Sequence, residues 1–72
     1  MRMVASVEIV LNGVPKQLPA LLTVAALLEA EGLAGKRVAV EKNGEIVPKS
    51  QHAAVTVHAG DRIEIVVAVG GG

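Results

Sequence analysis

The chain has 72 residues, in which seven Lys and Arg balance seven Asp and Glu, and it contains no cysteine. This length allows one small domain, and the lack of cysteine excludes a disulfide framework and a thiolate metal site. Zero net charge and the absence of Phe, Tyr and Trp argue against nucleic-acid binding, which uses basic patches and stacking platforms. No apolar run approaches the roughly 20 residues of a membrane span. With no signal-peptide pattern at the start, we expect a cytoplasmic protein.

The chain begins with a predicted β-hairpin. Apolar residues alternate with others over residues 3–11, which is the period of a strand. Asn12-Gly13 follows, and Asn-Gly between apolar runs is the strongest short hairpin signal because both turn residues need a positive φ. The returning strand covers residues 14–18. Its Pro15 lacks an N–H group, which suits a strand at the edge of a sheet.

One helix is predicted, over residues 24–31. Thr23 is the expected N-cap, because its hydroxyl can accept a hydrogen bond from a free N–H of the first turn. Three apolar residues then share one face at the spacing of an amphipathic helix. Gly32 suits the left-handed conformation that commonly ends a helix.

The second half predicts three further strands. Residues 37–42 alternate, Asn43-Gly44 marks another hairpin turn, and residues 45–48 form a short edge strand that ends at Pro48. A polar connection with one helical turn covers residues 48–54, and residues 55–57 form a short strand. In the last strand the chain alternates between two faces, with Ile63, Ile65, Val67 and Val69 on one and Arg62, Glu64, Val66 and Ala68 on the other.

This order of elements predicts an α+β fold with a mixed sheet of four to five strands. A hairpin followed by a crossover helix puts that one main helix on one face of the sheet. The apolar last strand is best buried at the centre, parallel to the first. That arrangement is the β-grasp, or ubiquitin-like, fold. We assign residues 1–69 to this domain and residues 70–72 to a flexible glycine tail.

Three blocks carry a resemblance to a known family: Asn-Gly-Glu-Ile-Val-Pro-Lys at residues 43–49, Gly-Asp-Arg-Ile-Glu-Ile at 60–65, and Ala-Val-Gly-Gly-Gly at 68–72. Together they resemble the sulfur-carrier proteins of bacterial thiamine (thiazole) synthesis. The last two blocks are shared with other β-grasp carriers, whereas the first is more particular to the thiazole branch. One departure is His52, which stands where family members often carry an aromatic residue.

The resemblance implies that the chain is a co-substrate and not an enzyme. An ATP-dependent adenylating (E1-like) enzyme would activate the Gly72 carboxylate, and a persulfide enzyme would convert it to a thiocarboxylate for thiazole synthase. ATP is consumed by that partner, so no bound cofactor is expected here. Gly70 and Gly71, without side chains, would let the tail enter a narrow channel.

Three other readings stay open. In the first, the chain is a sulfur carrier whose acceptor belongs to molybdopterin synthesis or tRNA thiolation. In the second, it is a ubiquitin-like modifier joined to lysines through Gly72. In the third reading, the chain is a plain binding module, and its glycines are a frayed end or a remnant of a cloning linker.

A partner-binding face is predicted beside the tail. Val66 and Ala68 point away from the expected core, near Ile46 and Val47, and an exposed apolar patch marks an interaction site. The alternative is that the connection over residues 48–54 covers Val66. Arg62, together with Asp61 and Glu64, would add a charged contact or simply be solvated.

No metal site is expected. His52 and His58 are the only histidines, and no acidic cluster accompanies them, whereas ordinary metal sites need three or four ligands. We therefore predict two surface or turn histidines.

Overall fold

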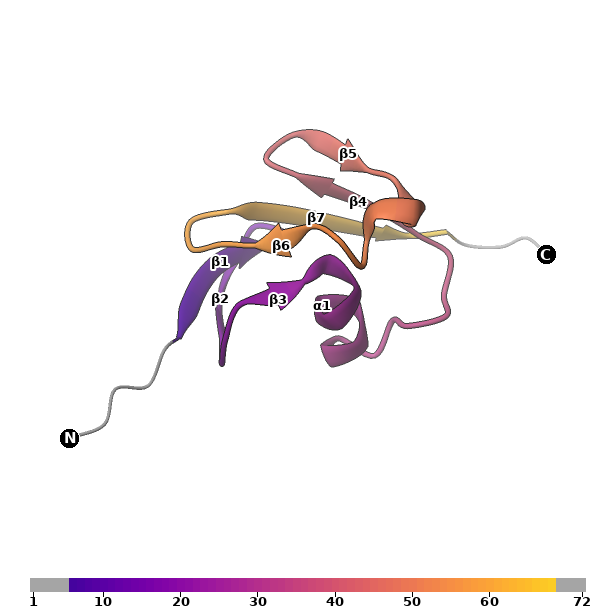
Figure 1. The fold of residues 1–72 in the computed structure, drawn as a ribbon. Helices are drawn as coiled ribbons and strands as arrows, with labels where there is room; N and C mark the ends of the chain where they lie inside the picture. Colours follow the sequence, from indigo (N-terminus) through magenta and orange to yellow (C-terminus); the bar gives the residue numbers. More distant parts are fainter. Residues whose placement is uncertain (1–5, 69–72) are drawn as a thin grey trace.

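The computed structural model describes residues 6–68, which form a five-stranded mixed sheet with one α-helix on one face (Figure 1). In chain order the elements are β1 (Val7–Leu11), β2 (Val14–Leu18), β3 (Leu22–Thr23), α1 (Val24–Ala30), β4 (Val38–Lys42), β5 (Glu45–Val47), the 3-10 helix η1 (Lys49–Gln51), β6 (Thr56–Val57) and β7 (Arg62–Val67). The predicted start of the first strand at residues 3–5 lies outside the described residues, as do Val69, Gly70, Gly71 and Gly72.

The strand order of the main sheet is β2-β1-β7-β4-β5. The last strand lies at the centre, parallel to β1 and antiparallel to β4, and β2 and β5 are the two edges. These are the positions predicted from the burial of β7 and from the prolines at the edges. The topology is therefore that of the β-grasp fold.

Both Asn-Gly pairs form the predicted hairpin turns. Asn12 and Gly13 have φ values of 51° and 82°, and Asn43 and Gly44 have values of 54° and 86°. Positive φ at both central residues is the requirement of a type I′ turn, whose twist matches that of the flanking strands. The sequence therefore defines the register of both hairpins.

Helix α1 begins at the predicted residue and ends at Ala30, one residue before the predicted end, with Glu31 as its C-cap. The Thr23 hydroxyl accepts a hydrogen bond of 3.0 Å from the N–H of Ala26. At the other end Gly32 has a φ of 75°, and the N–H of Leu33 donates to the Leu28 carbonyl at 2.8 Å. This bond, together with the one from Gly32 to Glu29 at 3.0 Å, forms the Schellman motif.

A second, two-stranded sheet ties the connection after β5 to the start of the helix. Its strands β3 and β6 have two residues each and pair antiparallel. Next to them, the N–H of Val24 donates to the carbonyl of Val55 and that of Ala25 to the carbonyl of His52, both at 2.8 Å. These bonds satisfy N–H groups that the first helical turn leaves free. Strand β3 was not predicted, because two residues are too few to show a period.

The core lies between α1 and the sheet and contains only aliphatic side chains. Its buried members are Val7, Ile9, Leu18, Val24, Leu27, Leu28, Val40, Val47, Val57, Ile63 and Ile65. Val67 was predicted on the same face, but it is 41% exposed. Val67 is the last residue of β7 and pairs with Val38, the first residue of β4. It therefore lies at the end of the sheet, beyond the buried Ile65.

Candidate functional site

The face of the sheet that turns away from α1 is open, and we call it the outer face. On β7, Arg62, Glu64 and Val66 are exposed and alternate with the buried Ile63 and Ile65, so their side chains point outward. Val66 is 63% exposed. Its predicted orientation is confirmed, and the alternative in which residues 48–54 cover it is wrong.

The other predicted members of this face lie on β5 and β7 or, for Ala68, directly after β7. Val66 pairs with Ala39 of β4, and Ile46 of β5 pairs with Glu41. Ile46 is 66% exposed, but strand β4 lies between it and β7. The face therefore has an apolar part around Val66 and a separate exposed isoleucine at its edge.

Val47 does not belong to the outer face, and the expectation that it does is wrong. It is only 8% exposed, and it pairs with the buried Val40, which in turn pairs with the buried Ile65. All three point into the core. The cause is the two-residue turn at 43–44, since that turn places Val47 opposite Val40.

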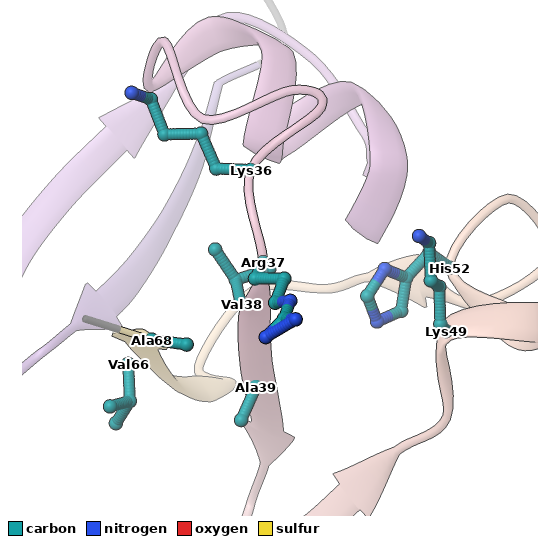
Figure 2. A pocket seen from close by; sticks show the side chains of 8 residues that line it. All are labelled: Lys36, Arg37, Val38, Ala39, Lys49, His52, Val66 and Ala68. Carbon is teal, nitrogen blue, oxygen red and sulfur yellow. The ribbon is translucent and has the colours of Figure 1, made fainter. Parts of the chain in front are cut away.

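A pocket of about 270 Å³ lies where β4 begins and β7 ends, and we call it the end pocket. Figure 2 shows the residues that line it, which are Lys36, Arg37, Val38, Ala39, Lys49, His52, Val66 and Ala68. Three of these side chains are cationic, four are apolar, and none is a carboxylate. The basic residues were not singled out from the sequence, because Lys49 lies twelve residues after Arg37 and only the fold brings it to the same pocket as Lys36 and Arg37.

The end pocket adjoins the last described residue of the chain. The N–H of Ala68 donates to the carbonyl of Arg37 at 2.8 Å, which extends the pairing of β7 with the segment before β4. Ala68 itself is exposed, as predicted. The pocket thus lies four residues before Gly72, and the predicted reactive carboxylate at Gly72 is outside the described part of the chain.

His52 lies in a turn, as one of the two predicted options has it, but it is buried and not at the surface. It is 8% exposed, and its Nε2 lies 3.1 Å from the carbonyl oxygen of Val47. A carbonyl only accepts, so Nε2 carries the proton and donates. The imidazole thus fills the position where the resemblance predicts an aromatic ring. The position of His52, where family members often carry an aromatic residue, was the one feature of the sequence that indicated its burial.

Asp61 joins two turns and is not free for the predicted charged contact. Its carboxylate accepts hydrogen bonds from the Asn43 amide at 3.0 Å and from the N–H of His58 at 2.8 Å, and Lys42 Nζ lies 3.7 Å away. Partial burial raises the pKa of Asp61, but these hydrogen bonds and the charge of Lys42 outweigh it, so the pKa lies below the ordinary 3.8. Arg62 and Glu64 remain exposed.

Within residues 6–68 no three His, Asp or Glu side chains are grouped as a metal site requires. In the same range, no helix has the length and apolar character needed to cross a membrane.

The sheet topology, the covering helix and the exposed outer face define a ubiquitin-like β-grasp protein. The model of the ThiS family matches residues 9–72, and the chain belongs to that family. The matched region includes the glycine run as well as the folded domain.

Solved structures agree with this assignment. The crystal structure of a thiamine biosynthesis protein (ThiS) from Geobacter metallireducens superimposes with a TM-score of 0.78 at 35% identity, covering 90% of this chain and 99% of that one. Among curated proteins, a thiazole synthase of Paramagnetospirillum magneticum is 49% identical and one of Magnetococcus marinus is 40% identical, each over 65 residues. These residues cover 90% of this chain but 20% of each relative. The chain therefore spans about a fifth of the length of the curated relatives that it matches.

Proposed function

We propose that the chain is a sulfur carrier in thiamine biosynthesis and that Gly72 bears the reactive carboxylate. The observation that carries this proposal is the family match, which runs through the β-grasp domain and the glycine run to residue 72. The likeness to a ThiS protein along nearly its whole length supports it. The aliphatic body then serves to present the tail to other proteins, and the exchange takes place in the cytoplasm.

The chemistry follows from the reactivity of a carboxylate. Its negative charge repels nucleophiles, so a partner enzyme first attaches AMP from ATP, which neutralises the charge and provides a leaving group. The outer sulfur of a persulfide then attacks the acyl adenylate and displaces AMP, which gives an acyl disulfide. A thiol cleaves the S–S bond of this intermediate and forms a disulfide with the donor sulfur, so the tail is released as a thiocarboxylate. Glycines suit a tail that enters the active sites of partner enzymes, because a backbone without side chains passes through a narrow channel. Fully extended, the residues after Ala68 reach on the order of 15 Å.

We propose thiazole synthase as the acceptor of the sulfur. Two curated relatives with that name contain a region similar to this chain within a longer polypeptide. When a carrier-like domain and a synthase are parts of one polypeptide, their encounter is intramolecular, which raises the effective concentration of the carrier at the synthase.

Intact-mass measurement tests the proposal. The chain is incubated with ATP, its cognate adenylating enzyme and a persulfide donor, and we expect the mass change that replaces one oxygen by sulfur. Deletion of Gly71 and Gly72 should abolish it, whereas deletion of Arg2 and Met3, two residues at the other end, should not.

Other results would contradict the proposal. A ladder of conjugates with other proteins would indicate a ubiquitin-like modifier. Equal behaviour of the two deletion variants would indicate a binding module whose glycines have no role. Loading with transfer to a molybdopterin or tRNA acceptor, and none to thiazole synthase, would move the carrier to another pathway.

A further inference from the structure

We propose that the end pocket is a docking site for a segment of the adenylating enzyme in which an apolar side chain is flanked by carboxylates. This inference rests on the function proposed above and adds the chemistry by which the partner is recognised. It assigns the contact to Arg37 and Lys49, and not to Arg62.

The charge of the pocket is the first reason. Lys36, Arg37 and Lys49 are all exposed and line one pocket that contains no carboxylate. In residues 6–68 the ion pairs are Lys16–Glu31 and Lys42–Asp61, so no described carboxylate pairs with these three cations. A chain with zero net charge thus has a local positive site, which attracts and orients a negatively charged partner surface.

The size and apolar lining of the pocket are the second reason. Val38, Ala39, Val66 and Ala68 contribute apolar side chains, and Val66 is exposed although it is a large hydrophobic residue. The volume of about 270 Å³ is below the roughly 300–1,000 Å³ of small-molecule sites. It suits a single anchoring side chain, with the cations around it contacting the acidic neighbours of that anchor.

The spread of the cations argues against a compact anion such as phosphate. Figure 2 shows the guanidinium of Arg37 over the middle of the pocket, while the ammonium group of Lys36 points away at one side and Lys49 lies beside His52 at the other. A phosphate group is bound by donors that converge on one point. Charges spread along a rim match several carboxylates of a protein segment instead.

The position of the pocket favours the adenylating enzyme as the partner. The hydrogen bond from Ala68 to the carbonyl of Arg37 fixes the end of β7 at the pocket wall. A segment seated there would hold the start of the tail at one place, and Gly72 lies four residues further on. Correct placement of a reacting group contributes strongly to rate, so docking at this pocket would direct the carboxylate into the active site.

The test measures ATP-dependent pyrophosphate release by the cognate adenylating enzyme as a function of carrier concentration. Arg37→Glu and Lys49→Glu should each raise the half-saturating concentration about tenfold or more and leave the plateau rate unchanged. Arg62→Glu is the matched control, since it makes the same change of charge on the outer face but outside the pocket. It should shift the half-saturating concentration by less than about threefold. Unchanged circular dichroism would show that each variant is folded.

Two results in this assay would overturn the proposal. If Arg37→Glu leaves the half-saturating concentration unchanged, the pocket is not used. If Arg62→Glu has the same effect as Arg37→Glu, general attraction between charges explains both. A concentration-dependent dimer of the free chain that Arg37→Glu dissociates would place a second copy in the pocket, and would also overturn it.

Failure of the proposed function can be distinguished from failure of the docking site. If the wild-type chain is not adenylated at all, the proposed function fails, and calorimetric titration with the same enzyme then tests the pocket by itself. Binding that Arg37→Glu abolishes and Arg62→Glu retains would support the docking site. Absence of binding would overturn it.

Discussion

At the scale of single residues, His52 shows how a polar side chain can be part of an aliphatic core. Its Nε2 donates to the carbonyl of Val47 at 3.1 Å, and Val47 is the last residue of the edge strand β5. A buried carbonyl without a donor costs about 1–3 kcal/mol. The imidazole therefore contributes both packing volume and the hydrogen bond that satisfies the end of this strand.

We predict that His52→Leu lowers the free energy of unfolding by about 1–3 kcal/mol, because it keeps a large side chain but removes the donor. Urea denaturation monitored by circular dichroism measures this change. His58→Leu is the control: His58 is exposed and bonds to Asp61 through its backbone N–H, so the change should stay within about 0.5 kcal/mol. Equal effects of the two substitutions would contradict the role given to the imidazole.

At the scale of elements, Asp61 and Asn43 connect the β4–β5 turn with the turn before β7. The two side chains bond to each other at 3.0 Å, and each also accepts a backbone N–H at 2.8 Å, from His58 and Arg62 respectively. These bonds favour the ionised form of Asp61, which is why its pKa lies below 3.8. A group with a lowered pKa in the folded state stabilises the fold above its unfolded pKa, and this contribution disappears as the pH falls through the folded pKa.

We therefore expect Asp61→Asn to be less stable than the wild type at pH 7, by at most about 1 kcal/mol because solvent screens the group. The difference should shrink as the pH falls below 3.8, where the wild-type carboxyl becomes protonated. Urea denaturation of both proteins across this range measures the effect. A difference that stays constant with pH would show that ionisation of Asp61 does not stabilise the two turns.

At the scale of the whole molecule, most of the fold could be predicted because local signals agreed with one another. The Asn-Gly turns, the helix caps at Thr23 and Gly32, and the apolar alternation of β7 all defined their elements. The small β3–β6 sheet could not be predicted, since its strands of two residues pair only after the chain has folded. Val67 is exposed at the end of the sheet, where it pairs with the first residue of β4, and alternation along the strand does not report where the core ends.

The candidate site was predicted less completely than the fold. The glycine run was recognised from residue types alone, and the outward orientation of Val66 followed from alternation. The orientation of the Val47 side chain toward the core could have been deduced, because a two-residue turn at 43–44 pairs residue 47 with the core residue Val40. The basic pocket could not have been deduced, since Arg37 and Lys49 are twelve residues apart in the sequence and line one pocket only in the folded chain.

The core face of the sheet should tolerate a charged residue much less well than the outer face. Substitutions at the neighbouring residues Ile65 and Val66 test this difference. Ile65 is 8% exposed and Val66 is 63% exposed, although both lie at the centre of the sheet in β7. Ile65→Asp would bury a charge without a partner, at a cost comparable to the 5–15 kcal/mol that stabilises a whole domain. Val66→Asp exchanges one solvated side chain for another, at about 1 kcal/mol for strand propensity.

We predict that Ile65→Asp is unfolded by circular dichroism at 25 °C, whereas Val66→Asp keeps a cooperative thermal transition. Val66 lines the end pocket, so its replacement by a carboxylate should repel an acidic partner segment and reduce thiocarboxylate formation about tenfold or more. Both variants add the same charge one residue apart, so only the face differs. If Val66→Asp unfolds, the outer face also stabilises the domain; if it folds and is loaded like the wild type, the partner docks elsewhere.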